Sequence, residues 1–212
     1  MSVRTTPPFR ADHVGSLLRP RALLQAREDA ARGAISLDDL RAIEDAAIRD
    51  AVAMQADIGL RSVTDGEFRR TSWHLDFIYE IAGNFRSSWV AQGGYDFVAD
   101  ALFNELTVDG YFMEFDDERS GGFAPLRFVP KGKYVVLGLV TSKKGQLEAK
   151  DDIKRRIEEA SKFVDIDQLC LSPQCGFSST MEGNSLSRDQ QIAKLRLVAE
   201  TAEEVWGASS AQ

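Results

Sequence analysis

Short apolar runs alternate with helical segments along this chain, and this alternation most restricts what it can fold into. Five runs read as strands that are apolar along their length and polar at their end: 11–16, 60–68, 108–116, 133–142 and 167–172. Segments with apolar residues at helical spacing accompany them: 36–58, 93–106, 148–164 and 188–206. This order predicts an α/β fold with a mainly parallel sheet.

The ends of the helical segments carry recognisable signals. Ser36, followed three residues later by Asp39, resembles a capping box at the start of the first segment. Gly207 ends the last segment before a short tail of small polar residues. We therefore interpret 1–206 as a single domain and expect 207–212 to be disordered.

Composition excludes several classes of function. The chain has 212 residues and a formal charge of −7, and no lysine- or arginine-rich run stands out, so we expect no nucleic-acid partner. No apolar stretch approaches the roughly 20 residues that span a bilayer, and the N-terminal residues lack the apolar centre of a signal peptide. We therefore expect no membrane partner and a cytoplasmic protein.

Two familiar motif classes are absent from the sequence. The run "HVGSLLRP" after the first predicted strand is not a GxGxxG loop, and no Walker motif occurs, which argues against a nucleotide site. Cys170 and Cys175 form neither a CxxC motif nor a disulfide framework, so a reducing compartment suits them as thiols.

Polar residues follow the predicted strands at the point where each ends. Because parallel strands share a carboxyl edge, we expect these side chains to converge on one face. The set is His13, Ser16, Asp65, Glu67, Glu114, Asp116, Asp117, Thr141, Ser142 and Cys175.

Glu114 and Cys175 each allow a structural and a functional interpretation. An acid between Met113 and Phe115 is costly to bury without a partner, a proton or a metal, but a salt bridge or cap satisfies it equally well. A lone cysteine is often a small core residue, whereas a thiolate needs a nearby cation such as zinc. A metal-independent α/β enzyme that uses Glu67 and Glu114 as acid and base is a further alternative.

Several motifs together resemble a known family. The stretches "ADHVGSLLRP", "VTDGEFRRTSWHLDF", "VDGYFMEFDDERSGGFAPLRFVP", "VVLGLVTSKKGQLE" and "DQLCLSPQCGFSST" resemble small proteins related to the C-terminal catalytic barrel of cobalamin-independent methionine synthase. The resemblance runs from about Phe9 to Gly207. It implies a (β/α)₈ barrel that transfers a methyl group, from a methylated folate or another donor, to the sulfur of homocysteine, with zinc binding the thiolate.

The resemblance also implies roles for individual residues. Glu114 of "FMEFDDER" and Cys175 of "SPQCGF" look like two of the four zinc ligands. The segments "HVGS" and "DGEF" look like homocysteine-binding pieces, which assigns substrate binding to Val14, Gly15, Ser16 and Glu67.

The sequence departs from the family pattern in two places. The family's remaining histidine and cysteine ligands belong to a stretch that precedes "GN", where this chain has Tyr79 and Ile81. The family also has a long segment, with about three strands, between parts that are contiguous here at 81–84. The larger methionine synthases further use a histidine as proton donor where this chain reads "LVTSKK", so no catalytic acid is assigned.

These departures predict an incomplete barrel. An eight-stranded barrel typically takes about 250 residues, and this chain shows five candidate strands in 212 residues. We expect a partial barrel with about five of eight strand–helix units, an incomplete zinc site and self-association through exposed sheet edges. An inactive, internally deleted fragment or a gene-model artefact, which at most binds an amino acid or a partner, is the alternative to zinc-dependent methyl transfer.

Overall fold

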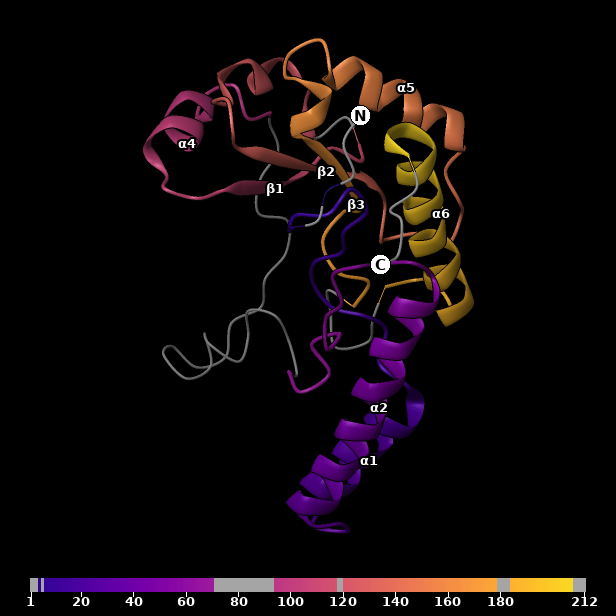
Figure 1. Cartoon of the computed structure of the whole chain (residues 1–212). Helices are drawn as coiled ribbons and strands as arrows, with labels where there is room; N and C mark the ends of the chain where they lie inside the picture. The colour runs from indigo at the N-terminus through magenta and orange to yellow at the C-terminus, as the bar shows by residue number, and fades with distance from the viewer. Residues whose placement is uncertain (1–3, 5, 71–93, 118–119, 179–183, 208–212) are drawn as a thin grey trace.

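The computed structural model of the chain describes residues 4, 6–70, 94–117, 120–178 and 184–207. Within them a small parallel sheet packs against helices. The helix pair α1 and α2 extends away from the sheet (Figure 1). The elements are α1 (Arg21–Ala31), α2 (Leu37–Asp57), α4 (Ala99–Glu105), β1 (Gly110–Glu114), β2 (Tyr134–Val140), α5 (Lys150–Ala160), β3 (Leu169–Pro173) and α6 (Arg188–Trp206). The predicted α/β class with a parallel sheet is confirmed.

The sheet has the order β1-β2-β3, and both pairs are parallel. In the middle strand β2, every residue from Val135 to Val140 is buried, which fits its nearly continuous apolar sequence. Beyond β3, Ala11 forms an isolated parallel bridge with Leu171, and the Asp12 amide donates to the Leu171 carbonyl at 2.9 Å. The segment around Ala11 therefore continues the sheet on its β3 side.

Two of the five predicted strands are not strands in the structure. The run 11–16 pairs only through Ala11, because Gly15 has φ +89° and turns the backbone out of the extended conformation. In 60–68 the backbone amide and carbonyl of Thr64 pair with the side chain of Gln55 from α2, at 3.0 and 2.8 Å, instead of with a neighbouring strand. The prediction of five strands was therefore wrong for the described residues.

The predicted helices are confirmed as α2, α4, α5 and α6. Ser36 and Asp39 form a complete capping box at the start of α2, as the sequence indicated. Ser187 and Gln190 form a second box at the start of α6, and Gly207 follows the last residue of that helix with φ +91°. The two capping boxes satisfy amides of the first turn that the helix cannot pair internally.

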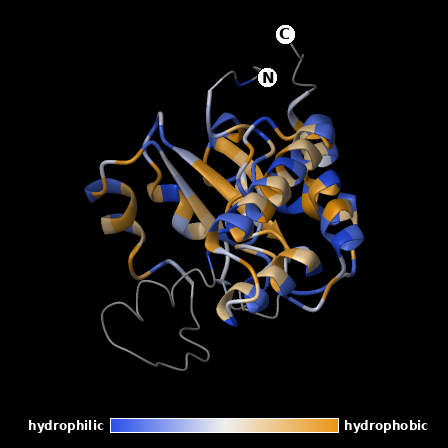
Figure 2. Cartoon of the chain, turned by 90° about the horizontal axis from the view of Figure 1, so that it is seen from below, coloured by the Kyte–Doolittle hydropathy of each residue, from blue (hydrophilic) through white to orange (hydrophobic). Residues whose placement is uncertain are grey.

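Two apolar clusters hold the fold together, and Figure 2 shows hydrophobic stretches along the strands and along the helices beside them. The larger cluster joins the sheet to α4, α5 and α6 and includes Phe103, Leu137, Ile157 and Trp206. The smaller cluster, which includes Leu17, Phe68 and Phe177, joins the helix pair α1 and α2 to the loops at the end of the sheet. The second cluster thus fixes the loops that carry the polar residues.

The β1 side of the sheet is open among the described residues. β1 pairs with β2 alone, and its Phe112 side chain is 47% exposed, while Phe97 before α4 is 98% exposed. No helix in the described part of the chain is both long enough and apolar enough to cross a bilayer. The predicted junction at 81–84 and the tail residues 208–212 lie outside the described residues.

Candidate functional site

Three neighbouring strands each deliver one reactive group to the carboxyl edge of the sheet. Glu114 is the last residue of β1, Lys143 follows β2, and Cys175 follows β3. Lys143 Nζ lies 3.3 Å from Cys175 Sγ. Gln174, which is almost fully buried, donates from Nε2 to Glu114 Oε2 at 3.0 Å. The sheet thus places a carboxylate, an ammonium and a thiol side by side.

Glu114 and Cys175 border a small pocket of about 110 Å³, here called the edge pocket. Its lining includes Val14, Phe112, Glu114, Gln174 and Cys175. Val14, Glu114 and Cys175 were all predicted as site residues from separate parts of the sequence. The structure brings these three together: the parallel-strand argument predicts this for Glu114 and Cys175, and Val14 was nominated by the resemblance.

A second pocket, of about 380 Å³, shares Val14 with the edge pocket. This turn pocket is lined by Val14, Gly15, Thr64, Asp65, Glu67, Arg69 and Arg70. Glu67 has φ +56°, a conformation that costs energy in a residue other than glycine and that is often found at functional sites. Its carboxylate pairs with Arg70 at 3.3 Å. Predicted residues Gly15 and Glu67 therefore lie in the turn pocket.

Ser16 is the predicted substrate residue that the structure places in neither pocket. It is buried, and it joins the two loops that carry Val14 and Cys175. Its carbonyl accepts from the Phe177 amide at 2.6 Å, and its hydroxyl accepts from the Ser178 amide at 3.1 Å. Gly15 and Gly176 permit this approach, because a Cβ on Gly15 would lie 2.7 Å from the Gly176 nitrogen.

The two cysteines differ in their surroundings. The Cys175 thiol has its pKa raised by burial first and by its hydrogen bond with Glu114 second, while the charge of Lys143 acts in the opposite direction. Cys170 lies in β3, fully buried, and burial raises its thiol pKa to about 11. Cys170 is therefore a core residue, and Cys175 is the accessible thiol of the site.

His13 is buried beside Phe177, with ring centroids 5.9 Å apart. Neither imidazole nitrogen has a partner in ordinary hydrogen-bond geometry, and burial lowers the pKa of His13 to about 4, an effect that the Gly15 backbone offsets only in part. The buried side chain thus stays neutral at physiological pH. His13 does not join Glu114 and Cys175 in any group of metal-binding side chains within the described residues.

This pKa predicts an acid-sensitive fold. Because the unfolded chain binds the proton near pH 6.5 and the folded chain near 4, stability is unaffected above about pH 7 and falls as pH drops through this window. We expect the free energy of unfolding to fall by about 2 kcal/mol by pH 5 and by about 3 kcal/mol below pH 4. Urea unfolding of the wild type and of His13→Leu at pH 7, 6 and 5 measures this pH dependence of stability. Parallel pH dependences in the two proteins would contradict the assignment.

The described residues do not complete a zinc site. Structural and catalytic zinc sites use three or four protein donors. The described residues contain no group of three or more histidine, cysteine, aspartate or glutamate side chains arranged to hold a metal. Of the residues that the resemblance nominates, Glu114 and Cys175 are described, and Tyr79 and Ile81, which occupy the places of its other two ligands, lie outside the described residues.

The sequence argument missed the two groups that contact the candidate ligands directly. Gln174 adjoins Cys175 in the same motif, and Lys143 follows β2 in "LVTSKK", but no spacing rule indicates that either side chain reaches across to a neighbouring loop. Glu67 and Glu114, the acid–base pair of the metal-independent alternative, line two different pockets that share Val14.

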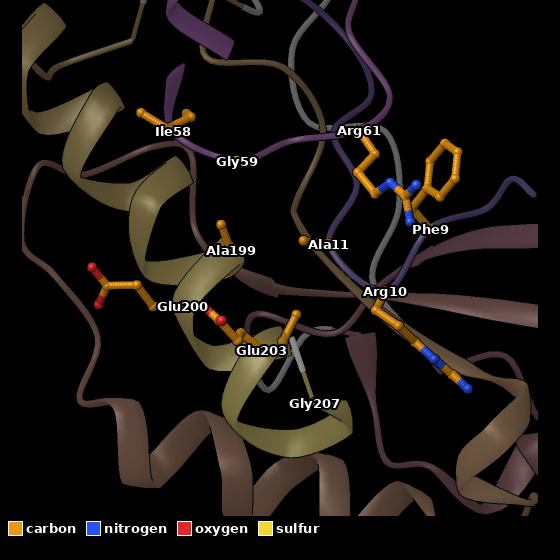
Figure 3. Close-up of a pocket in the computed structure, with 11 residues that line it drawn as sticks. Phe9, Arg10, Ala11, Ile58, Gly59, Arg61, Ala199, Glu200, Glu203 and Gly207 are labelled. Carbon is orange, nitrogen blue, oxygen red and sulfur yellow. The ribbon is translucent and has the colours of Figure 1, made fainter. Parts of the chain in front are cut away.

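A further pocket of about 200 Å³ lies toward the amino end of the sheet, between α6 and the segment Phe9–Ala11 (Figure 3). The Arg61 side chain lies against the Phe9 ring, with its guanidinium carbon 5.3 Å from the ring centroid, and the Arg10 side chain points away from the pocket. No predicted site residue lines it. We therefore place the candidate chemistry at the carboxyl edge.

The fold and site define an α/β protein whose polar groups gather at the carboxyl edge of a parallel sheet. No protein-family model matches the chain. The chain is 32% identical to the uncharacterized protein YxjG of Bacillus subtilis and 33% identical to its uncharacterized protein YxjH, over 96% and 94% of this chain and 96% and 95% of those proteins. The chain therefore belongs to the family of these two proteins.

The alignments also reveal a difference in length. They extend over 363 and 358 positions, more than the 212 residues of this chain, so each relative has stretches without a counterpart here. Among solved structures, the candidate vitamin-B12-independent methionine synthase of Listeria monocytogenes is similar, with a TM-score of 0.76, 26% sequence identity, and coverage of 97% of this chain and 100% of that chain. The chain is thus structurally related to proteins of the methionine synthase type.

Proposed function

We propose that this protein is a methyltransferase of the vitamin-B12-independent methionine synthase type that takes the thiol of homocysteine as methyl acceptor. The observation that carries the proposal is the position of Val14, which lines both the edge pocket and the turn pocket. A small amino acid with a thiol at its end can therefore lie across Val14, with its charged head in one pocket and its sulfur in the other. The similarity to the Listeria structure supports the same reaction class.

The charges of the turn pocket fit an amino-acid head group. Glu67 offers a carboxylate to an ammonium group, and Arg70 offers a guanidinium to a carboxylate. Glu114 and Cys175 at the far side of Val14 are the groups that would face the sulfur. Bound zinc supplies a thiolate at neutral pH in this reaction class. With two donors described, this chain holds and orients the acceptor but does not finish the metal site.

The order of the strands supports a partial barrel as the scaffold. In a closed eight-stranded barrel the last strand pairs with the first, and here β3, the last strand, bridges in parallel to Ala11 near the start of the chain. The open β1 side is where the segment without a counterpart would continue the sheet. We propose self-association through this edge, which sedimentation over a range of protein concentrations tests.

A second function is favoured by the donor count. If the two described donors are all that the folded chain offers, the protein binds an amino-acid ligand without transferring a methyl group. In this reading, an internal deletion in this chain or a gene-model artefact explains why the relatives are longer. The transcript sequence around the codons for 81–84 separates these two origins.

One experiment on the purified 212-residue chain distinguishes the functions. Zinc per chain, calorimetric binding of L-homocysteine, and methyl transfer from a methylated folate are measured for the wild type and for Cys175→Ser, with Cys170→Ala as the control thiol. If the proposal holds, we expect homocysteine binding with methyl transfer, and a drop in zinc and in transfer for Cys175→Ser alone. Stoichiometric zinc with methyl transfer establishes the enzyme, binding without zinc or transfer establishes the second function, and absence of binding contradicts both.

A further inference from the structure

Lys143 places a fixed positive charge against the candidate metal-binding thiol. Its Nζ atom lies 3.3 Å from Cys175 Sγ. Cys175 is in turn hydrogen-bonded with Glu114. The thiol and the carboxylate that would bind a metal are therefore next to an ammonium group supplied by the chain itself.

The loop that carries Lys143 is anchored on several sides, so the base of the Lys143 side chain is held beside the site. The Lys143 amide donates to the Thr141 hydroxyl at 3.3 Å, and the Thr141 amide donates to Glu148 Oε1 at 2.9 Å. Glu148 pairs with the fully buried Lys194 at 2.8 Å. The Ser142 carbonyl accepts from Asn184 Nδ2 at 2.8 Å. A loop fixed in this way keeps the Lys143 backbone within reach of Cys175.

A zinc ion bound to both donors would approach this ammonium closely. Zinc lies about 2.3 Å from a thiolate sulfur and about 2.0–2.2 Å from a carboxylate oxygen. A divalent cation there would be within a few ångström of Lys143 Nζ, where like charges repel strongly even in a solvated site. The same ammonium attracts the thiol sulfur and so satisfies it without a metal.

From this geometry we infer that Lys143 sets the metal preference of the site: its ammonium takes the place of a metal ion beside Cys175 and weakens zinc binding to Glu114 and Cys175. The inference rests on the proposed function only in taking Glu114 and Cys175 as the metal donors. Its readout is zinc affinity, which needs no turnover.

Zinc affinity is measured by competition with a chromophoric chelator for the whole purified chain. The variants are Lys143→Gln, which removes the charge, Lys143→Arg, which keeps it, and Lys144→Gln, which removes the neighbouring exposed charge. We expect Lys143→Gln to bind zinc at least about 10-fold more tightly than the wild type. Lys143→Arg and Lys144→Gln should stay near the wild type, and adding Cys175→Ser to Lys143→Gln should remove the gain.

Two results would overturn the inference. One is equal zinc affinity in Lys143→Gln and Lys144→Gln. The other is a wild-type protein that retains one zinc per chain through purification, which would at the same time strengthen the methyltransferase proposal. Circular dichroism verifies the fold, and Lys143→Met replaces Lys143→Gln if the latter does not fold. Protection of Cys175 from iodoacetamide by added zinc, larger in the charge-removed variant, provides an independent measurement of the same effect.

Discussion

Replacing Gly176 with alanine is expected to lower the free energy of unfolding by about 3 kcal/mol, through overpacking and lost hydrogen bonds. A Cβ at this position would lie 2.3 Å from the nitrogen and from the hydroxyl oxygen of Ser16. The same Ser16 accepts from the amides of Phe177 and Ser178, so the clash also disturbs the bonds that join the two loops. Urea unfolding monitored by circular dichroism measures the change.

Three other glycines separate steric clash from backbone strain. Gly15 combines φ +89° with a close neighbour, whereas Gly132 has φ +89° and nothing within 4 Å of the added Cβ. Gly122 has neither a close neighbour nor a positive φ. We expect Gly15→Ala and Gly176→Ala each to lower the free energy of unfolding the most. Gly132→Ala should lower it by about 1 kcal/mol, and Gly122→Ala hardly at all. Equal costs for Gly176→Ala and Gly122→Ala would show that the loops are not in contact.

Replacing Lys194 with methionine is expected to lower the free energy of unfolding by about 3 kcal/mol, because it leaves a partly buried carboxylate without its cation. Lys194 is fully buried and donates to both oxygens of Glu148 at 3.0 and 2.8 Å and to the Gln146 carbonyl at 2.6 Å. The Glu148 side chain is only 22% exposed, so solvent screens this pair weakly. Thermal and urea unfolding measure the loss.

The matched control is Lys150, whose ion pairs lie at the surface. It contacts Glu200 and Glu204 at 2.9 and 2.8 Å, but those side chains are 51% and 43% exposed. We expect Lys150→Met to have little effect on the free energy of unfolding, because solvent screens these surface pairs. Adding Glu148→Leu to Lys194→Met should recover much of the loss, since no unpaired charge then remains. A loss in Lys194→Met no larger than that in Lys150→Met would contradict the buried pair.

Sequence patterns predicted the regular elements whose apolar spacing is strong. β2 is apolar throughout, and α2 and α6 begin at capping boxes, so local chemistry and tertiary packing agree there. The segment 60–68 was predicted as a strand because it is β-prone, but the side chain of Gln55 binds its backbone. α1 was not predicted at all, although it begins directly after Pro20. In 60–68 a side-chain contact from α2 decided the outcome, and α1 shows that a proline before a segment can mark a helix start.

The candidate site was predicted in part, for a physical reason. Residues at the ends of parallel strands must meet, and Glu114 and Cys175 do so in the edge pocket, where Val14, nominated by the resemblance, joins them. Loop side chains are not constrained in this way, so the contacts of Lys143 and Gln174 become visible only in the structure. The resemblance assigned Ser16 to substrate binding, but its backbone and hydroxyl are engaged in holding the loops together.

Calorimetric titration of L-homocysteine tests most directly the claim that one amino-acid ligand lies across the two pockets. Val14 lines both pockets and is 40% exposed, so Val14→Arg fills the site without disturbing a core. Val63 is 41% exposed and lines neither of these two pockets, which makes Val63→Arg the matched control. We predict binding to the wild type and to Val63→Arg, and at least about 10-fold weaker binding to Val14→Arg, because the arginine side chain occupies the shared position. Equal affinity in the two variants, or no binding to the wild type, would contradict the account.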